Sequence, residues 1–141
     1  MLKISAKLDY ACRALLELSL HWPNPLPLQV NEIARRQKIP TKFLVHILIM
    51  LKQFGLVESL RGQKGGYVLS RAPKDISLYT LFEIFSEKKL KVSQFYKSDM
   101  GLINQICQEG ESVMGDYFKH INFETMRLRY RSQEKVPLYS I

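Results

Sequence analysis

The sequence predicts a mainly α-helical fold with one small β-hairpin, because three patterns recur along its 141 residues. Apolar residues repeat at helical spacing in several stretches, proline or glycine ends most of them, and two short β-prone runs lie near the middle. No apolar run approaches the roughly 18 residues that a membrane-spanning helix needs. We therefore expect a cytoplasmic protein without a membrane partner.

Three helices are predicted in the first half of the chain. The first covers residues 5–21, and the proline-rich stretch 22–27 ends it, since proline lacks an amide hydrogen. A short helix over 31–38 stops at Ile39-Pro40. The third helix continues from there to Phe54. Its apolar residues recur every three to four positions, which predicts that one face is buried.

Local chemistry marks the ends of the third helix and the hairpin after it. The Thr41 hydroxyl is expected to cap the first turn, and Gly55 to end the helix in a left-handed conformation. The runs 56–60 and 67–70 are β-prone, and the basic, glycine-rich segment 61–66 joins them. A short helix, a tight break, a longer helix and a hairpin form the order of a helix-turn-helix with a wing.

The second half is predicted to be helical. Ser77 is expected to cap a helix over 78–85, and a second helix is expected over 102–121, followed by a shorter segment with Met126 and Leu128. The predicted domains are a winged helix-turn-helix over 1–85, a connecting loop and dimerisation helix over 86–131, and a C-terminal tail over 132–141.

The charge is distributed unevenly. Residues 1–75 contain 12 Lys and Arg against 5 Asp and Glu, a net charge of +7, whereas residues 76–141 contain 9 against 8, a net charge of +1. A polyanion such as double-stranded DNA is the natural partner of the basic half, because neutralised phosphates release their counterions. A solvated basic surface that keeps the protein soluble is the alternative.

The second helix of a helix-turn-helix lies in the major groove, and the wing reaches a phosphate or the minor groove. Hydroxyl and cationic side chains near the start of that helix bind phosphates and base edges. The predicted DNA contacts are therefore Thr41, Lys42, His46, Arg61, Gly62, Lys64, Gly65 and Gly66. Several of them have a plainer explanation: Lys42 is a solvated helix residue, His46 is a surface or partly buried histidine, and the glycines belong to an ordinary tight turn.

An enzyme is not expected. The chain has no His-Glu-x-x-His or Cys-x-x-Cys motif, and its three histidines are scattered. The late apolar stripe Val113, Tyr117, Phe118 and Ile121 is predicted to form a dimer seam, since DNA half-sites commonly match a two-fold symmetric protein. An intramolecular core is the alternative.

The residues also resemble a family. The similarity lies in Ser5–Ala11, Val30–Ala34, Ile39–Leu44, Leu51–Val57, Arg61–Leu69, Ala72-Pro73 and Ile76–Leu78. On these motifs the chain resembles the bacterial winged-helix regulators typified by the iron–sulfur cluster regulator IscR, the nitric-oxide sensor NsrR and the rhizobial iron regulator RirA. The resemblance implies a homodimer that binds partly palindromic promoter DNA, with a long dimerisation helix in the second half.

The resemblance also implies an iron–sulfur cluster on three cysteines in or near that helix. Only Cys107 lies in this region, and Ser93, Gln94 and Ser98 occupy the preceding loop, so no cofactor is expected. The alternative, also implied by the family, is an atypical cluster shared across the dimer by Asp9, Cys12 and Cys107.

The expected function is that of a dimeric, sequence-specific DNA-binding transcription regulator. Two alternatives remain: an iron–sulfur-dependent redox or iron sensor with the shared ligand set, and a non-specific nucleic-acid-binding module. Selective binding to a two-fold site distinguishes the regulator from the module.

Overall fold

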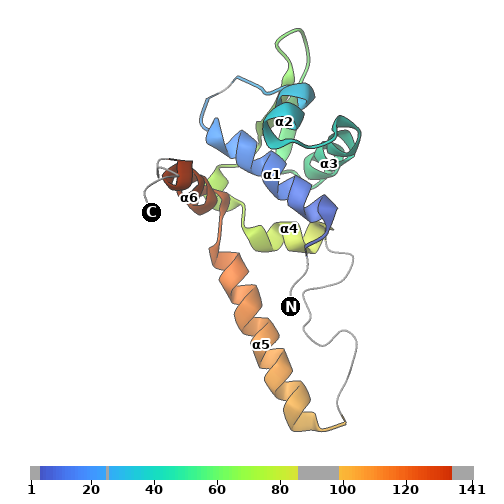
Figure 1. Cartoon of the computed structure of the whole chain (residues 1–141), viewed down its shortest axis with the longest axis vertical. Coiled ribbons are helices and arrows are strands. Elements are labelled where there is room, and N and C mark those ends of the chain that lie inside the picture. Colours follow the sequence, from blue (N-terminus) through green and yellow to red (C-terminus); the bar gives the residue numbers. More distant parts are fainter. Residues whose placement is uncertain (1–3, 25, 86–98, 135–141) are drawn as a thin grey trace.

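The computed structural model describes residues 4–24, 26–85 and 99–134 (Figure 1). The fold is mainly helical with a two-stranded antiparallel wing, as the sequence predicts. In chain order the elements are α1 (Ala6–Leu20), α2 (Val30–Gln37), α3 (Thr41–Gln53), β1 (Val57–Leu60), β2 (Gly66–Leu69), the 3-10 turn η1 (Pro73–Asp75), α4 (Leu78–Phe85), α5 (Gly101–His120) and α6 (Phe123–Glu134).

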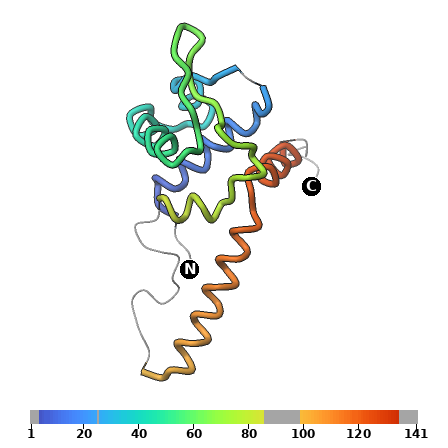
Figure 2. The backbone as a smooth tube through the Cα atoms, turned by 180° about the vertical axis from the view of Figure 1, so that it is seen from behind, coloured from blue at the N-terminus to red at the C-terminus, as the bar shows by residue number. Residues whose placement is uncertain are grey.

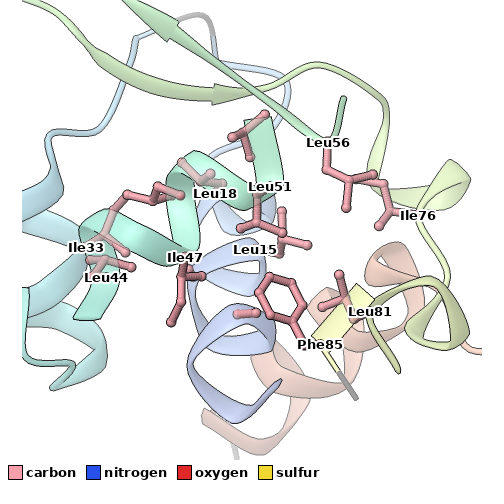
Figure 3. Packing of buried hydrophobic residues seen from close by; sticks show 14 of the residues in the cluster. Leu15, Leu18, Ile33, Leu44, Ile47, Leu51, Leu56, Ile76, Leu81 and Phe85 are labelled. Atoms are coloured by element: carbon pink, nitrogen blue, oxygen red, sulfur yellow. The ribbon is translucent and has the colours of Figure 1, made fainter. Parts of the chain in front are cut away.

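Helix α1 is the centre of the packing. It contacts α2, α3, α4 and α6, and its Leu15 is completely buried. Figure 3 shows Leu15 beside Leu51 of α3 and Leu81 of α4. Phe123 of α6 is equally buried in this core. The helical repeat of apolar residues thus correctly predicts a buried face on α2, α3 and α4, which pack against α1.

The wing is a two-stranded hairpin, and Leu28 forms an isolated β-bridge with its base. Leu60 of β1 pairs with Gly66 of β2, so residues 61–65 form the tip. Leu28 bridges to Tyr67 through two backbone hydrogen bonds, of 3.0 Å from the Leu28 amide and 2.8 Å from the Tyr67 amide. In Figures 1 and 2 the hairpin projects beyond α2 and α3.

Most of the helix ends lie at the capping and terminating residues that the sequence predicts. Gly55 has a φ of +74° just after α3, and the Ser77 hydroxyl accepts a 3.2 Å hydrogen bond from the Thr80 amide at the start of α4. The predicted Thr41 cap is wrong. Pro40 occupies the cap position, no side chain caps α3, and Thr41 is already its first helical residue.

Among the described elements, helix α5 packs against α4 near its C-terminal end, and the rest of the helix extends away from the core (Figures 1 and 2). Gly115 is buried there, and a Cβ atom at this residue would lie 3.5 Å from the Tyr79 ring of α4. The rings of Phe118 and Phe82 are 4.8 Å apart. The N-terminal half of α5 thus projects from a C-terminal end that is packed against α4.

Helix α6 returns to α1. Arg127 donates a 3.0 Å hydrogen bond to the Trp22 carbonyl, and Arg131 donates one of 2.7 Å to the Leu20 carbonyl. Residues 132–134, expected to begin the tail, continue α6, and 135–141 lie outside the described residues. So do Ser93, Gln94 and Ser98 of the predicted loop. Among the described helices, none has the length and apolar character needed to cross a membrane.

Candidate nucleic-acid interface

Helix α3 has one buried face and one exposed face. Leu44, Ile47, Leu48 and Leu51 are buried against the core. The opposite stripe consists of Lys42, Val45, His46 and Ile49, all of them exposed. These four residues occupy positions i, i+3, i+4 and i+7, so their side chains leave the helix on one side. This stripe, which we call the outer stripe, is the surface that α3 can present to a major groove.

The start of α3 is suited to binding phosphate. Thr41 and Lys42 are exposed in its first turn, and that turn contains no acidic residue. The first amides of a helix have no carbonyl within the helix to bind, and they form its positive end. The Phe43 and Leu44 amides donate to the Pro40 carbonyl. Because no side chain caps α3, the amides of Thr41 and Lys42 can donate to a phosphate oxygen while the Lys42 ammonium supplies the charge.

The turn between α2 and α3 is held by a residue of α1. Lys38 adopts a left-handed conformation with a φ of +53°, and the Ile39 amide donates a 3.0 Å hydrogen bond to the Ala34 carbonyl. Arg13 donates to the carbonyls of Gln37 and Lys38. The sequence gives no sign of this role for Arg13, because only the tertiary fold brings it to residues 24 and 25 positions away.

A buried carboxylate fixes α2 on α1. Glu17 is 5% exposed, and it accepts hydrogen bonds from Arg36 at 3.1 Å and Gln37 at 2.8 Å. His21 lies 3.3 Å from the same carboxylate. Burial alone would raise the pKa of Glu17, but the hydrogen bonds from Gln37, Arg36 and His21 lower it below its usual value. Arg36 therefore stabilises the helix pair and is not simply a solvated cation.

The wing presents its basic residues to solvent. Arg61, Gly62 and Lys64 are exposed at the tip. Gly65 is buried and Gly66 half-buried. A Cβ at Gly65 would lie 2.4 Å from the Leu60 carbonyl oxygen, and one at Gly66 would lie 2.4 Å from the Leu28 carbonyl oxygen. Packing within the chain is thus sufficient reason for glycine at these two positions.

The wing is also tied to both helices of the helix-turn-helix. The Gln29 side chain, next to the start of α2, donates a 3.4 Å hydrogen bond to the Gln63 carbonyl. The Lys52 ammonium of α3 donates a 2.8 Å hydrogen bond to the Ser59 hydroxyl of β1. Figure 1 shows α3 and the hairpin at the end of the molecule remote from the N-terminal end of α5. The predicted contact residues of α3 and the wing therefore belong to one end.

The predicted dimer residues are divided between two faces of α5. Val113 and Tyr117 are 69% and 56% exposed. Phe118 packs on Phe82, and the carbonyl of Ile121 accepts a 2.7 Å hydrogen bond from the Leu78 amide. Phe118 and Ile121 thus belong to the packing within the chain.

The exposed apolar residues of α5 extend much further towards its N-terminus than the predicted dimer seam, which begins at Val113. The additional ones are Leu102, Ile103 and Ile106, at 60%, 44% and 53% exposed. Helical spacing places Leu102, Ile106, Val113 and Tyr117 on one stripe, the seam stripe. The same spacing could have revealed the first two residues in the sequence.

The residues present do not fit a cysteine-bound iron–sulfur cluster within one chain. Burial, followed by the charge of Asp9, raises the pKa of the Cys12 thiol to about 12, whereas a cluster needs the thiolate. Asp9 itself forms a 3.0 Å ion pair with Arg13. In the parts of the chain that the structure describes, no group of three or more His, Cys, Asp or Glu side chains could hold a metal ion.

Comparisons with known proteins agree with this architecture. The family model Rrf2, described as an iron-dependent transcriptional regulator, matches residues 4–127. An rrf2-like helix-turn-helix protein of Rhodobacter capsulatus is 45% identical over 80 residues, which are 55% of this chain and 53% of that protein. The matched segment therefore spans about half the length of that relative.

Two solved structures have the same fold. The IscR protein of T. potens is 25% identical, with a TM-score of 0.76 over 96% of this chain and 93% of that one. CymR of B. subtilis, the global cysteine regulator, is 22% identical, with a TM-score of 0.81 over 92% and 98%. Regulators of this family bind DNA. The chain belongs to the Rrf2 family of winged helix-turn-helix transcriptional regulators.

Proposed function

We propose that this protein is a cytoplasmic homodimer that binds a two-fold symmetric promoter site through α3 and the wing. The observation that carries this function is the outer stripe of α3, exposed at the same end of the molecule as Arg61 and Lys64. Lys42 and the uncapped start of α3 bind phosphates, and the stripe meets base edges. The basic wing binds the adjacent backbone.

The proposed dimer uses the seam stripe of α5. Four exposed apolar residues in line on a projecting helix are costly in water, and a second copy covers them by packing its own stripe against them. Gly110 lies near the middle of the helix, where a Cβ would meet nothing within 4 Å. The two helices can therefore approach closely at this point.

A double substitution in the wing tests DNA binding. We expect Arg61→Ala with Lys64→Ala to weaken binding to all sequences and to reduce the slope of log affinity against log salt by about 1.8 per protomer, at about 0.9 for each lost phosphate contact. Titrations at several salt concentrations measure this slope. A matched control is Lys119→Ala with Arg129→Ala, which removes two charges from α5 and α6. Equal slopes for the two double variants would show that the wing is only a turn.

We further propose that the protein regulates without a cysteine-bound cluster. The support is the chemistry of the donors: two cysteines in the whole chain, one of them held protonated by burial. Anaerobically purified protein should be colourless, and Cys107→Ala should bind DNA like the parent. The alternative, a cluster shared across the dimer by Asp9, Cys12 and Cys107, predicts brown protein whose iron and sulfide are lost in Cys107→Ala. Stoichiometric iron in freshly purified parent protein would contradict the proposal.

A further inference from the structure

We infer that Val45 and Ile49 recognise thymine in the operator by packing against its C5-methyl group in the major groove. This inference rests on the proposed sequence-specific binding and deepens it, because it names the base that two particular side chains read. It starts from an unexplained feature of α3: two branched aliphatic side chains lie on the outer stripe, 38% and 44% exposed.

The packing of the protein does not account for these two residues. The core side of α3 is filled by Leu44, Ile47, Leu48 and Leu51, all buried on the opposite face. Helix propensity does not account for them either, since β-branched residues lose side-chain freedom in a helix and are weaker helix formers than Ala, Lys or Glu. An aliphatic group held out in water is also less well solvated than a polar one.

The residues beside Val45 and Ile49 indicate which partner buries these two side chains. Val45 and Ile49 lie between and beside Lys42 and His46 on the same stripe, next to the uncapped start of α3. This stripe lies on the second helix of the helix-turn-helix, the helix that regulators with this motif place in the major groove. Bases display hydrogen-bonding groups in the major groove, and among them only thymine carries a methyl group. An aliphatic side chain therefore contributes most to the binding free energy when it packs on thymine. At the other bases it leaves polar groups without a hydrogen-bonding partner.

The spacing of the two residues makes the inference more specific. Four residues of α-helix advance about 6 Å, which corresponds to roughly two base-pair steps along B-DNA. Val45 and Ile49 can therefore reach thymines about two base pairs apart in one half-site. Lys42, one turn before Val45, would then contact the backbone or a guanine edge at the border of this pair.

The experiment has two stages and uses the full chain. Double-stranded DNA of random sequence is first selected for binding, which defines the half-site. Each thymine of that site is then replaced by deoxyuridine, which keeps the pairing with adenine and removes only the methyl group. We expect one or two of these replacements to raise Kd about fourfold each, the effect of exposing one buried methyl group.

Protein variants assign the methyl contacts to side chains. Ile49→Ala and Val45→Ala should bind more weakly to the thymine site and should each lose the sensitivity to deoxyuridine at one position. Alanine keeps the helix stable, so folding is retained. The control is Phe54→Ala, which removes another exposed apolar side chain, 53% exposed and about 140° around the helix from Ile49. This variant should keep the full methyl sensitivity of the parent.

The outcomes distinguish a failure of the proposed sequence-specific binding from a failure of the proposed thymine contact. If selection enriches no common sequence, the proposed sequence-specific function fails. If it enriches a two-fold site without thymine in the half-site, or one where deoxyuridine changes nothing, the function stands and this inference is overturned. The inference is also overturned if the alanine variants keep the parent's methyl sensitivity, or if they alter the oligomeric state in light scattering, which would place a second copy on these residues.

Discussion

At the scale of single residues, Glu17 and Arg13 do most to place the helix-turn-helix. Both lie on α1, and both bind α2 or the turn after it. A buried carboxylate is unfavourable unless it is hydrogen-bonded, and here its partners come from two helices. The hydrogen bonds that hold α2 in place therefore depend on the ionised form of Glu17.

The lowered pKa of Glu17 gives a testable pH dependence. A carboxyl group whose pKa is lower in the folded state stabilises the protein above its unfolded pKa, near 4.5, and this stabilisation disappears as the pH falls through the folded value. We expect Glu17→Gln to reduce the free energy of unfolding by about 1–3 kcal/mol at pH 7. Urea unfolding at pH 7 and pH 3 should show a smaller difference from the parent at the lower pH.

The matched control for this prediction is Glu58→Gln on the exposed side of β1. This substitution removes the same charge without disturbing a buried cluster, and it should leave stability within about 0.5 kcal/mol of the parent. A loss for Glu17→Gln that is equal at both pH values would contradict the role of its ionisation.

At the scale of elements, the wing depends on its base more than on its tip. Gly66 has a φ of +149°, and its backbone pairs with Leu60 next to the bridge between Leu28 and Tyr67. A side chain there is strained and also collides with the Leu28 carbonyl. Gly62, at the tip, has a φ of +108° but open space around it. An added side chain would strain the backbone at both glycines, but it would also collide with another atom only at Gly66. Comparing the two positions therefore distinguishes the cost of collision from that of backbone strain.

We expect Gly66→Ala to destabilise the protein by about 2 kcal/mol or more, and Gly62→Ala by about 1 kcal/mol, since only the first adds a steric collision to the strained backbone. Thermal or urea unfolding measures both. DNA affinity, measured where each variant is fully folded, should fall more for Gly66→Ala, because the position of the whole tip changes. Equal stability losses would contradict the proposed collision with Leu28.

At the scale of the whole molecule, the second half does not form a separate unit. Helix α5 projects, but α6 packs back on α1: Phe123 is buried in the core. Arg127 and Arg131 bind the carbonyls of Trp22 and Leu20, at and just beyond the end of α1. A chain truncated near Glu109 would therefore lose core packing as well as any dimer seam. Point substitutions on α5 test the dimer without this loss.

We expect Val113→Glu to raise the dimer dissociation constant by at least about a hundredfold, since it buries an unpaired carboxylate in the proposed seam. Light scattering over a range of protein concentrations measures it. Leu128→Glu is the control, because Leu128 is 57% exposed on α6 and lies outside the seam stripe. A Val113→Glu variant that stays dimeric at the parent's concentrations would rule out this seam.

The sequence by itself determined the order of the elements. Proline at 23 and 40, glycine at 55 and the Ser77 hydroxyl act through the backbone of their own neighbours, so they can be recognised without knowing the fold. The exposure of the residues predicted at the start of α3 and at Arg61 and Lys64 also followed from the order of the elements, and their contacts with DNA stay a prediction. The Thr41 cap failed because Pro40 already occupies the cap position.

Only the tertiary structure decided which residues hold these elements together. Arg13 and Glu17 resemble ordinary charged helix residues in the sequence, and their partners in α2 and the turn after it lie 19 or more positions away. Phe118 and Tyr117 are neighbours with the same apolar character, yet one packs on Phe82 and the other faces solvent. The physical reason is that periodicity gives the face of a helix but not its partner. Which surface meets that face depends on how the distant helices pack around α1.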